Sequence, residues 1–223
     1  MSIIKKIRSK VAKTMITYNM LEKNDRILIA YSGGKDSIIM TDILINLQKK
    51  VPFHFDLKLV IISALKREKI EESIKQFNLE YEIIKFNNST LERAKSPCQI
   101  CSRIRRGALY DYAIKNNYNK IALGHHLDDV IETFFMNQLF QAKLETMKAT
   151  FLSDDKRNRI IRPLHSILED DLISYFSEKE FKLLNRNCPF RVKGTKREEI
   201  KTLLSNFNKM EKSNIYYSLK SFF

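Results

Sequence analysis

The sequence predicts an α/β protein in which helices cover both faces of a doubly wound, mostly parallel, five-stranded sheet. Apolar segments rich in β-branched residues alternate with segments of helical periodicity between residues 25 and 165. This alternation is typical of a Rossmann-like sheet, because each parallel connection needs a crossover, usually a helix. Of the 223 residues, 43% are hydrophobic, which is enough for one substantial core.

The individual elements follow from periodicity and from the residues that interrupt it. We expect strands at 25–31, 55–63, 81–86, 119–126 and 159–164. We expect helices at 37–50, 66–78, 102–117 and 127–141. The chain therefore divides into a basic amphipathic N-terminal helix at 1–24 packed on the core, a sheet domain at 25–165, and a helical C-terminal extension at 166–223.

The net charge of +14 is concentrated in three basic segments. They are residues 1–20, residues 93–106 and the tail from Lys182 onward. Such segments favour a polyanionic partner, because each neutralised phosphate releases counterions; a solvated, lysine-rich surface is the alternative. No stretch is apolar enough to span a membrane, and the basic N-terminal stretch lacks the continuous apolar core of a secretory signal, so we expect a cytoplasmic protein.

The stretch "YSGGKDS" at residues 31–37 lies between a predicted strand and a predicted helix. In an open parallel sheet, ligands bind at the carboxyl ends of the strands. The backbone N–H groups of such a loop, two serine hydroxyls and Lys35 together make an anion site. Asp36 in the same loop is consistent with a Mg²⁺ ion that accompanies phosphates.

The residues "SGGKDS" resemble the PP-loop of the ATP pyrophosphatase family, whose fold is an adenine-nucleotide α-hydrolase-like sheet. The resemblance implies that residues 25–165 form a PP-loop ATP pyrophosphatase domain. It also implies that the loop holds the β- and γ-phosphates as leaving pyrophosphate while AMP is transferred to a substrate oxygen. A nucleophile can then displace AMP.

Three cysteines are candidates for a metal centre: Cys98 and Cys101 in a C-x-x-C, and Cys188 in "NRNCPF". In a cytoplasmic protein, structural disulfides are disfavoured. A C-x-x-C alone is typical of redox or metal sites, and zinc would need a fourth ligand such as a histidine. Three thiolates also suit a [4Fe–4S] cluster with one iron left open. Spacing alone does not separate zinc from iron–sulfur.

The stretch "CQICSRIRRGALY" followed by "IALGHHLDD" resembles the tRNA 2-thiocytidine synthetase family, and the similarity extends over most of the chain. This resemblance implies an ATP-dependent tRNA sulfurtransferase that replaces the C2 oxygen of a pyrimidine, cytidine 32, with sulfur. It implies ATP, Mg²⁺ and a [4Fe–4S] cluster as cofactors. It also implies tRNA, a sulfur donor such as a cysteine desulfurase, and a second copy in a homodimer as partners.

The same resemblance assigns roles to individual residues. The metal ligands would be Cys98, Cys101 and Cys188. The nucleotide would be held by Ser32, Gly33, Gly34, Lys35, Asp36, Ser37, Gly124 and His125. The catalytic residues would be Lys35, Asp36, Asp128, Asp129 and Arg105. With all three cysteines bound to the cluster, none would remain to carry a persulfide.

Two other functions compete with tRNA thiolation. A tRNA lysidine synthetase uses a related loop and a similar "GHHxxD" stretch, but its nucleophile is an amine and it needs no cysteines. A non-catalytic basic RNA-binding module would not need Lys35, Asp36 and the glycine pair together with "LDD". Release of pyrophosphate from ATP would separate the module from both enzymes.

Overall fold

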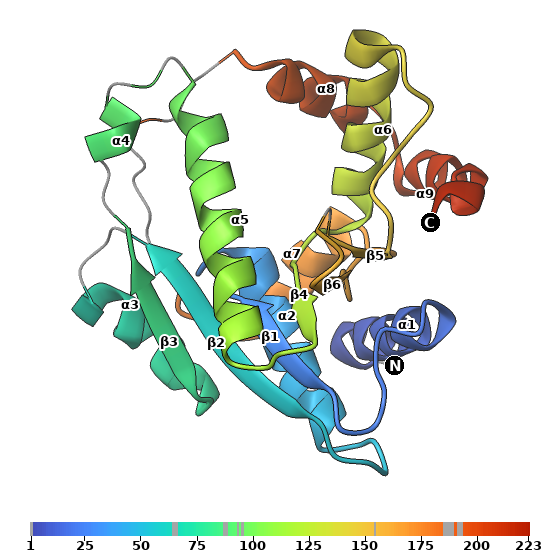
Figure 1. Ribbon diagram of the computed structural model, residues 1–223. Coiled ribbons are helices and arrows are strands. Elements are labelled where there is room, and N and C mark those ends of the chain that lie inside the picture. The colour runs from blue at the N-terminus through green and yellow to red at the C-terminus, as the bar shows by residue number, and fades with distance from the viewer. Residues whose placement is uncertain are drawn as a thin grey trace.

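The computed structural model describes residues 2–63, 67–86, 89–92, 94, 96–153, 155–184, 190 and 194–223. Its sheet contains six strands in the order β3-β2-β1-β4-β6-β5 (Figure 1). The strands are β1 (Arg26–Ala30), β2 (Asp56–Ser63), β3 (Tyr81–Lys85), β4 (Lys120–Ala122), β5 (Thr150–Leu152) and β6 (Arg159–Ile161). The helices are α1 (Ile3–Thr17), α2 (Lys35–Gln48), α3 (Arg67–Ile74), α4 (Ser89–Glu92), α5 (Pro97–Lys115), α6 (Leu127–Gln141), α7 (Glu169–Ser177), α8 (Lys196–Ser205) and α9 (Lys209–Ser218), with 3₁₀ turns at Lys75–Phe77 and Lys220–Phe222.

The predicted α/β class with a mostly parallel sheet is confirmed, but the sheet has six strands, and not five, in the part of the chain that the structure describes. β1 pairs in parallel with β2 on one side and with β4 on the other. The extra strand is β5, which pairs antiparallel with β6 at the edge of the sheet. Only three residues long, β5 carries too few alternating positions to be recognised by periodicity.

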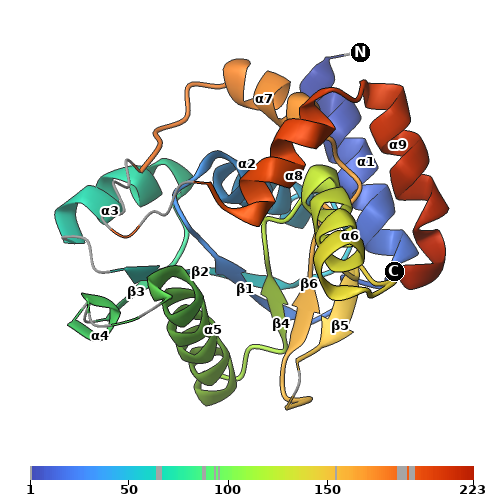
Figure 2. The ribbon, with the colours of Figure 1, turned by 90° about the horizontal axis from the view of Figure 1, so that it is seen from above.

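Helices cover both faces of the sheet, as the crossover connections require (Figure 2). On one face α5 packs through Leu109 and Ala113 against apolar residues of β1, β2, β4 and β6. On the other face lie α1, α2 and α7, whose buried residues join the main cluster of the core. The amphipathic helix α1 contributes Ile7, Val11 and Met15 to that cluster.

The helix α5 begins at Pro97, five residues earlier than the sequence predicted. Proline is well suited to the first turn of a helix, because the N–H groups there have no acceptor within the helix and proline has no N–H to leave unpaired. The prediction took Pro97 as part of a loop. The consequence is that Cys98 and Cys101 lie in the first turns of α5 and not before it.

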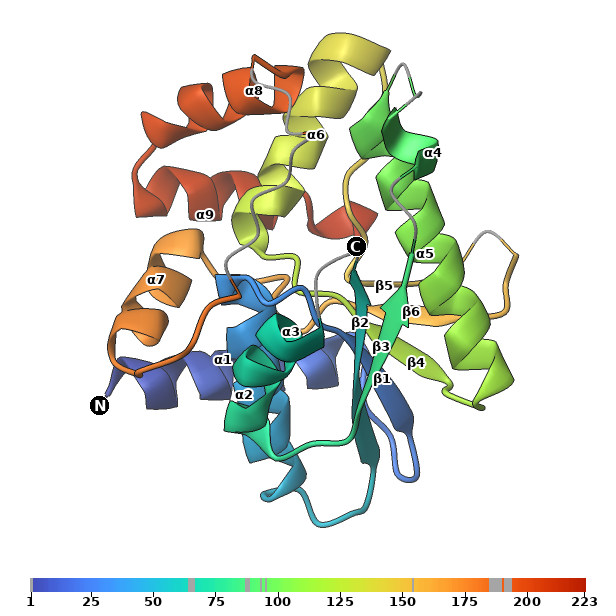
Figure 3. The same cartoon turned by 90° about the vertical axis from the view of Figure 1, so that its left-hand side faces the viewer.

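The C-terminal helices α8 and α9 pack on α6 (Figure 3). A separate apolar cluster joins Leu127, Val130 and Ile131 of α6 to Ile200, Leu204 and Tyr216 of α8 and α9. The chain after the sheet therefore returns to the helix that follows β4. Among the described residues, no helix is both long and apolar enough to cross a membrane.

Candidate active site

The stretch that resembles a PP-loop forms a tight turn between β1 and α2. Gly34 is the N-cap of α2, so the first N–H groups of that helix are free to face an anion. The Ser32 and Ser37 hydroxyls lie 3.0 Å apart, and Ser37 also donates to the Gly34 carbonyl at 2.9 Å. The Lys35 ammonium contacts the Asp36 carboxylate at 2.7 Å and lies 3.7 Å from Glu169. A phosphate would therefore compete with these two carboxylates for Lys35.

Gly33 occupies a position that no other residue fits without strain. Its φ is +74°, in the left-handed region that favours glycine. A Cβ built on Gly33 would lie 2.3 Å from the Cβ of Leu184, which precedes the segment that carries Cys188. The Leu184 N–H also donates to the Gly33 carbonyl at 2.9 Å. The C-terminal extension thus packs directly on the PP-loop.

Gly124, at the end of β4, is explained by the backbone that faces it. A Cβ there would lie 3.3 Å from both the Asp36 carbonyl carbon and the Ser37 nitrogen. The sequence interpretation gave the nucleotide as the reason for this glycine. The structure gives another: the start of α2 approaches the end of β4 so closely that a Cβ would make tight contacts with its backbone.

A cavity of about 750 Å³ opens at this edge of the sheet. Its lining contains these predicted site residues: Ser32, Asp36, Ser37, Cys98, Cys101, Arg105, Gly124, His125 and Asp129. It also contains Arg106, Tyr110 and apolar residues from β1 and β2. The PP-loop, the C-x-x-C and the first residues after β4 therefore share one cavity. Gly33, Gly34, Lys35 and Asp128 are not part of this lining.

His125 is fixed by a buried arginine that the sequence did not single out. The Arg162 Nε donates to Nδ1 of His125 at 3.0 Å, and its Nη1 donates to the Lys148 carbonyl. Burial, together with the Arg162 charge, lowers the pKa of His125 to about 4. The imidazole is therefore neutral at pH 7, with Nδ1 as acceptor and the proton on Nε2. Burial also lowers the pKa of Arg162 to about 10.

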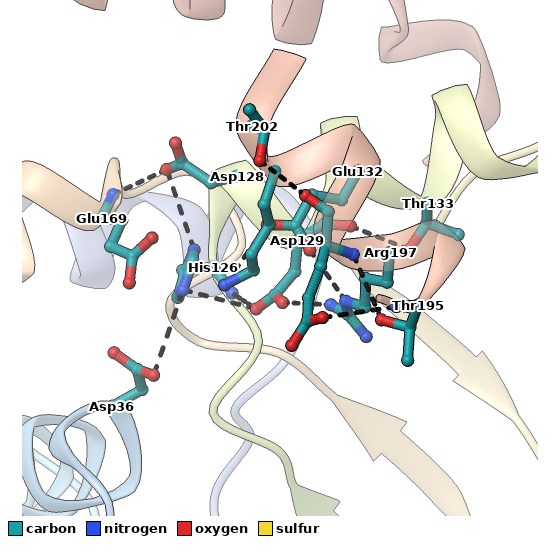
Figure 4. Close-up of polar contacts among 12 residues, drawn as sticks. Asp36, His126, Asp128, Asp129, Glu132, Thr133, Glu169, Thr195, Arg197 and Thr202 are labelled. Carbon is teal, nitrogen blue, oxygen red and sulfur yellow. Dashed lines mark hydrogen bonds and ion pairs between the residues drawn. The ribbon is translucent and has the colours of Figure 1, made fainter. Parts of the chain in front are cut away.

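His126 lies among three carboxylates (Figure 4). Its Nε2 is 4.0 Å from Asp36 and 3.5 Å from Asp129, and its Nδ1 is 3.8 Å from Asp128. The side chain is buried, and Nδ1 has no hydrogen-bond partner within the described part of the chain. His126 thus connects the PP-loop to the start of α6.

Asp128 and Asp129 are neighbours in sequence but have different partners. The Asp129 carboxylate accepts from the His126 N–H at 3.1 Å and from Arg197 of α8 at 2.6 Å. Burial alone would raise its pKa, but His126, His125 and Arg197 hold the pKa of Asp129 below its ordinary value. It is therefore ionised at neutral pH.

Asp128 points away from the cavity toward the C-terminal helices. It accepts from the Glu169 N–H at 2.7 Å, at the start of α7, and forms an ion pair with Lys212 of α9 at 2.9 Å. A carboxylate at the N-terminus of a helix is stabilised by the helix dipole. These contacts account for Asp128 as a residue that joins α6, α7 and α9.

The C-x-x-C places two thiols on one face of α5, facing the cavity. Cys98 and Cys101 are free and three residues apart, so their side chains are neighbours on the helix. The Cys98 thiol donates to the Phe190 carbonyl at 3.3 Å. Cys188, the third predicted ligand, lies outside the described residues, and within them no group of three His, Cys, Asp or Glu side chains could hold a metal ion. The two thiols could form part of a metal centre whose other protein ligands come from elsewhere.

Arg162, Arg197 and Leu184 are the residues of the site that sequence reasoning missed. Arg162 belongs to the predicted strand "RIIRPL", and the sequence analysis gave it no role. Arg197 is one of many basic residues in the tail. Nothing in a single sequence distinguishes a guanidinium that reaches a distant carboxylate from one in solvent.

Comparison with known proteins agrees with this geometry. Residues 4–186 match the PP-loop domain family. The chain is 36% identical, over 97% of its own length and 85% of the relative's, to tRNA-cytidine(32) 2-sulfurtransferase 1 from Francisella tularensis subsp. tularensis. It is 39% identical to a tRNA-cytidine(32) 2-sulfurtransferase from Shewanella sediminis, over 90% and 66% of the two lengths. The chain belongs to the tRNA-cytidine(32) 2-sulfurtransferase family of PP-loop proteins.

Solved structures support the same assignment. The U34-tRNA thiolase NcsA from Methanococcus maripaludis, solved with its [4Fe-4S] cluster, superposes with a TM-score of 0.80 at 26% identity. The match covers 97% of this chain and 79% of the thiolase. The NH3-dependent NAD synthetase from Campylobacter jejuni matches with a TM-score of 0.50 at 16% identity, which shows a shared fold alone. As a member of the sulfurtransferase family, the chain is an ATP-binding transferase of the PP-loop type.

Proposed function

We propose that this protein replaces the C2 oxygen of cytidine 32 in tRNA with sulfur, at the expense of ATP. The observation that carries the proposal is the single cavity lined by the PP-loop, the C-x-x-C and Asp129. An adenylating site needs an anion-binding loop, and a thiolating site needs a sulfur centre beside it. The sulfurtransferase relatives support tRNA as the substrate, and the basic segments at 1–20 and 93–106 supply charge for its phosphates.

In the first half-reaction, ATP would bind with its β- and γ-phosphates at the start of α2. The N–H groups there, the Ser32 and Ser37 hydroxyls and Lys35 would hold these phosphates, and Asp36 would bind the accompanying Mg²⁺. The C2 oxygen of the pyrimidine then attacks the α-phosphorus, and the bond to pyrophosphate breaks. Arg105 would neutralise charge that develops at the transferred phosphoryl group.

In the second half-reaction, a sulfur nucleophile at the oxidation level of sulfide forms a bond to C2 and loses its proton, and the C2–oxygen bond breaks so that AMP leaves with that oxygen. A [4Fe–4S] cluster held by Cys98, Cys101 and Cys188 would supply an iron without a protein ligand, where sulfur can be delivered. Asp129 and the neutral His125 line the same cavity, where an ionised carboxylate and an N–H donor can hold or move the proton of the exocyclic amine. Asp128 is not part of the cavity lining and is less suited to that work. A cysteine desulfurase as sulfur donor and a homodimer remain predictions from the resemblance.

The test is a thiolation assay with anaerobically purified protein, ATP, a sulfide source and unmodified tRNA. Pyrophosphate release and 2-thiocytidine in the digested tRNA are measured, together with iron and labile sulfide per chain. Replacing Cys98, Cys101 or Cys188 with Ser is expected to abolish thiolation and to lower the iron content, with the fold intact by circular dichroism. Lys35→Met is expected to abolish pyrophosphate release, whereas Lys49→Met, at the other end of α2, is expected to leave it unchanged. Thiolation that survives any cysteine replacement contradicts the proposal.

A further inference from the structure

Arg162 is a buried cation whose hydrogen-bond acceptors are neutral. It is 8% exposed, and its backbone N–H donates to the Ala149 carbonyl at 3.0 Å. Its guanidinium donates to Nδ1 of His125 and to the Lys148 carbonyl, and its central carbon lies 4.8 Å from the centroid of the Phe151 ring. In the part of the chain that the structure describes, neither acceptor is a carboxylate. Because a buried charge without a counter-ion is costly, packing alone does not account for an arginine at this position.

The contact between Arg162 and His125 determines which ring nitrogen carries the proton. A guanidinium has only donors, so Nδ1 of His125 is the acceptor and the neutral ring carries its proton on Nε2. The two ring nitrogens point to different sides of the imidazole, so the Nε2–H points away from Arg162. His125 is part of the cavity lining and Arg162 is not. Among the described residues the hydrogen bond of this ring is the one at Nδ1, which leaves the Nε2–H for a ligand.

Charged groups on several elements act on the His125 ring. Burial is the largest influence and, with the Arg162 charge, lowers the pKa of His125 to about 4. Arg197 of α8 and the neighbouring His126 also lower this pKa, whereas Asp129 of α6 raises it. The helix α5 contributes three further polar groups to the lining of the same cavity, namely Arg105, Arg106 and Tyr110. At neutral pH the ring is therefore a neutral hydrogen-bond donor.

We propose that Arg162 is a positioning residue that holds His125 as an N–H donor to an oxygen atom of ATP or of the pyrimidine. This inference rests on the proposed function and divides the work in the cavity between two side chains. His125 donates from Nε2 and takes up no proton. The Asp129 carboxylate is then the group that accepts a hydrogen bond or a proton from the exocyclic amine. Arg162 itself does not touch the substrate, since it is not part of the cavity lining.

The form of the His125 ring is measured by NMR in cluster-free, full-length protein, without reference to activity. Labelling the four histidines with ¹⁵N shows which nitrogen of each ring carries the proton, and the signals that His125→Gln lacks belong to His125. The variants are Arg162→Met, which removes the donor to Nδ1, and Arg162→Lys, which keeps one. The matched control is Arg159→Met, which replaces an exposed arginine of the strand that leads to Arg162. Thermal unfolding is recorded for each protein.

The unchanged protein, Arg159→Met and Arg162→Lys are expected to carry the His125 proton on Nε2 at pH 7. In Arg162→Met the ratio of the Nε2–H form to the Nδ1–H form is expected to fall by about tenfold or more, because a charge-assisted hydrogen bond to Nδ1 is lost. An unchanged ratio in Arg162→Met, or an Nδ1–H form in the unchanged protein, overturns the inference. Where Arg162→Met does not fold, Arg162→Lys and the kinetics of the His125 variants decide.

Thiolation kinetics separate a donor at His125 from a base, because the side-chain amide of glutamine donates a hydrogen bond but takes up no proton. His125→Ala is expected to lower kcat by about a hundredfold, and His125→Gln by less than about tenfold. Arg162→Met is expected to lower kcat by about tenfold or more, with the KM for tRNA within about twofold. In the His125→Ala background the same change is expected to have no further effect, because Arg162 acts through His125.

Equal losses in His125→Ala and His125→Gln overturn the inference, as does a further loss when Arg162→Met is added to His125→Ala. The Arg159→Met control is expected to keep the kcat of the unchanged protein. If the unchanged protein releases no pyrophosphate and forms no 2-thiocytidine, the proposed function fails instead, and the NMR result alone decides whether Arg162 fixes the form of His125.

Discussion

Replacing Gly33 with alanine is expected to destabilise the whole fold, not only ATP binding. At φ of +74° an alanine carries strain of about 1–2 kcal/mol, because its Cβ approaches its own backbone. Its Cβ would also lie 2.3 Å from the Cβ of Leu184, and overpacking of that kind costs about 1–3 kcal/mol. Together these effects lower the free energy of unfolding by about 2–5 kcal/mol, a fall in Tm of about 4–20 °C for a chain of this size.

Gly34→Ala is the matched control in the same loop. The φ of Gly34 is −85°, and among the described residues a Cβ there would meet only the Ser32 hydroxyl, at 3.4 Å. We expect its stability to stay within about 1 kcal/mol of the unchanged protein. Its affinity for ATP is nevertheless expected to fall, because the added methyl group stands where phosphates approach the start of α2.

The assay is urea unfolding followed by circular dichroism, with ATP binding measured by calorimetry on cluster-free protein. A Gly33→Ala protein as stable as Gly34→Ala would refute the reasoning, since both variants add one methyl group to the same loop. The double variant Gly33→Ala, Leu184→Gly checks the source of the loss. In the Leu184→Gly background, Gly33→Ala is expected to lower the free energy of unfolding by less than it does in the unchanged protein, because the overlap with the Leu184 side chain is gone. The loss that remains is the backbone strain at residue 33.

Three further predictions concern stability away from the PP-loop. Lys120→Met is expected to cost about 3–5 kcal/mol in chemical unfolding, because it leaves the buried Asp25 without the cation 2.7 Å away. Gly107→Ala, within α5 where a Cβ meets no atom of the described residues within 4 Å, is expected to raise the unfolding free energy by about 0.5–1 kcal/mol. Burial lowers the pKa of His165 to about 4, whereas in the unfolded chain it is about 6.5. The contribution of the neutral imidazole to the stability of the fold is therefore complete above about pH 6.5 and is lost as the pH falls toward 4. His165→Gln should therefore reduce the loss of stability between pH 7 and pH 5 by about 2 kcal/mol, as unfolding at both pH values would show.

The sheet was predictable where strands are long and buried on both faces. β1 and β2 lie inside the predicted segments, because continuous runs of Ile, Leu and Val have few other stable environments. β5 was not predicted, because its three residues form a strand through pairing with β6 and show no recognisable periodicity in the sequence. The start of α5 was missed because proline occurs both in turns and in the first turn of helices.

The active site was predictable to the extent that it follows from the sheet. β1 and β4 are adjacent and parallel, so the residues after each of them must meet at one edge. This brings Ser32 and Asp36 beside Gly124 and His125 in the same cavity. The contacts of Arg162, Leu184 and Arg197 depend on how α8 and the edge strands pack. No local pattern encodes such packing, so these residues could be found only in the structure.

The sequence does not predict which of the adjacent carboxylates Asp128 and Asp129 faces the cavity. Successive residues on a helix point about 100° apart, so one of two adjacent carboxylates can face the cavity while the other faces a packed neighbour. Which one does so depends on the cations supplied by other elements: Lys212 of α9 for Asp128, and Arg197 of α8 for Asp129. Both cations come from the C-terminal extension, outside the sheet domain. The two carboxylates therefore differ in their contacts with that extension, and a comparison of Asp128→Asn with Asp129→Asn should show loss of stability in the first and loss of thiolation in the second.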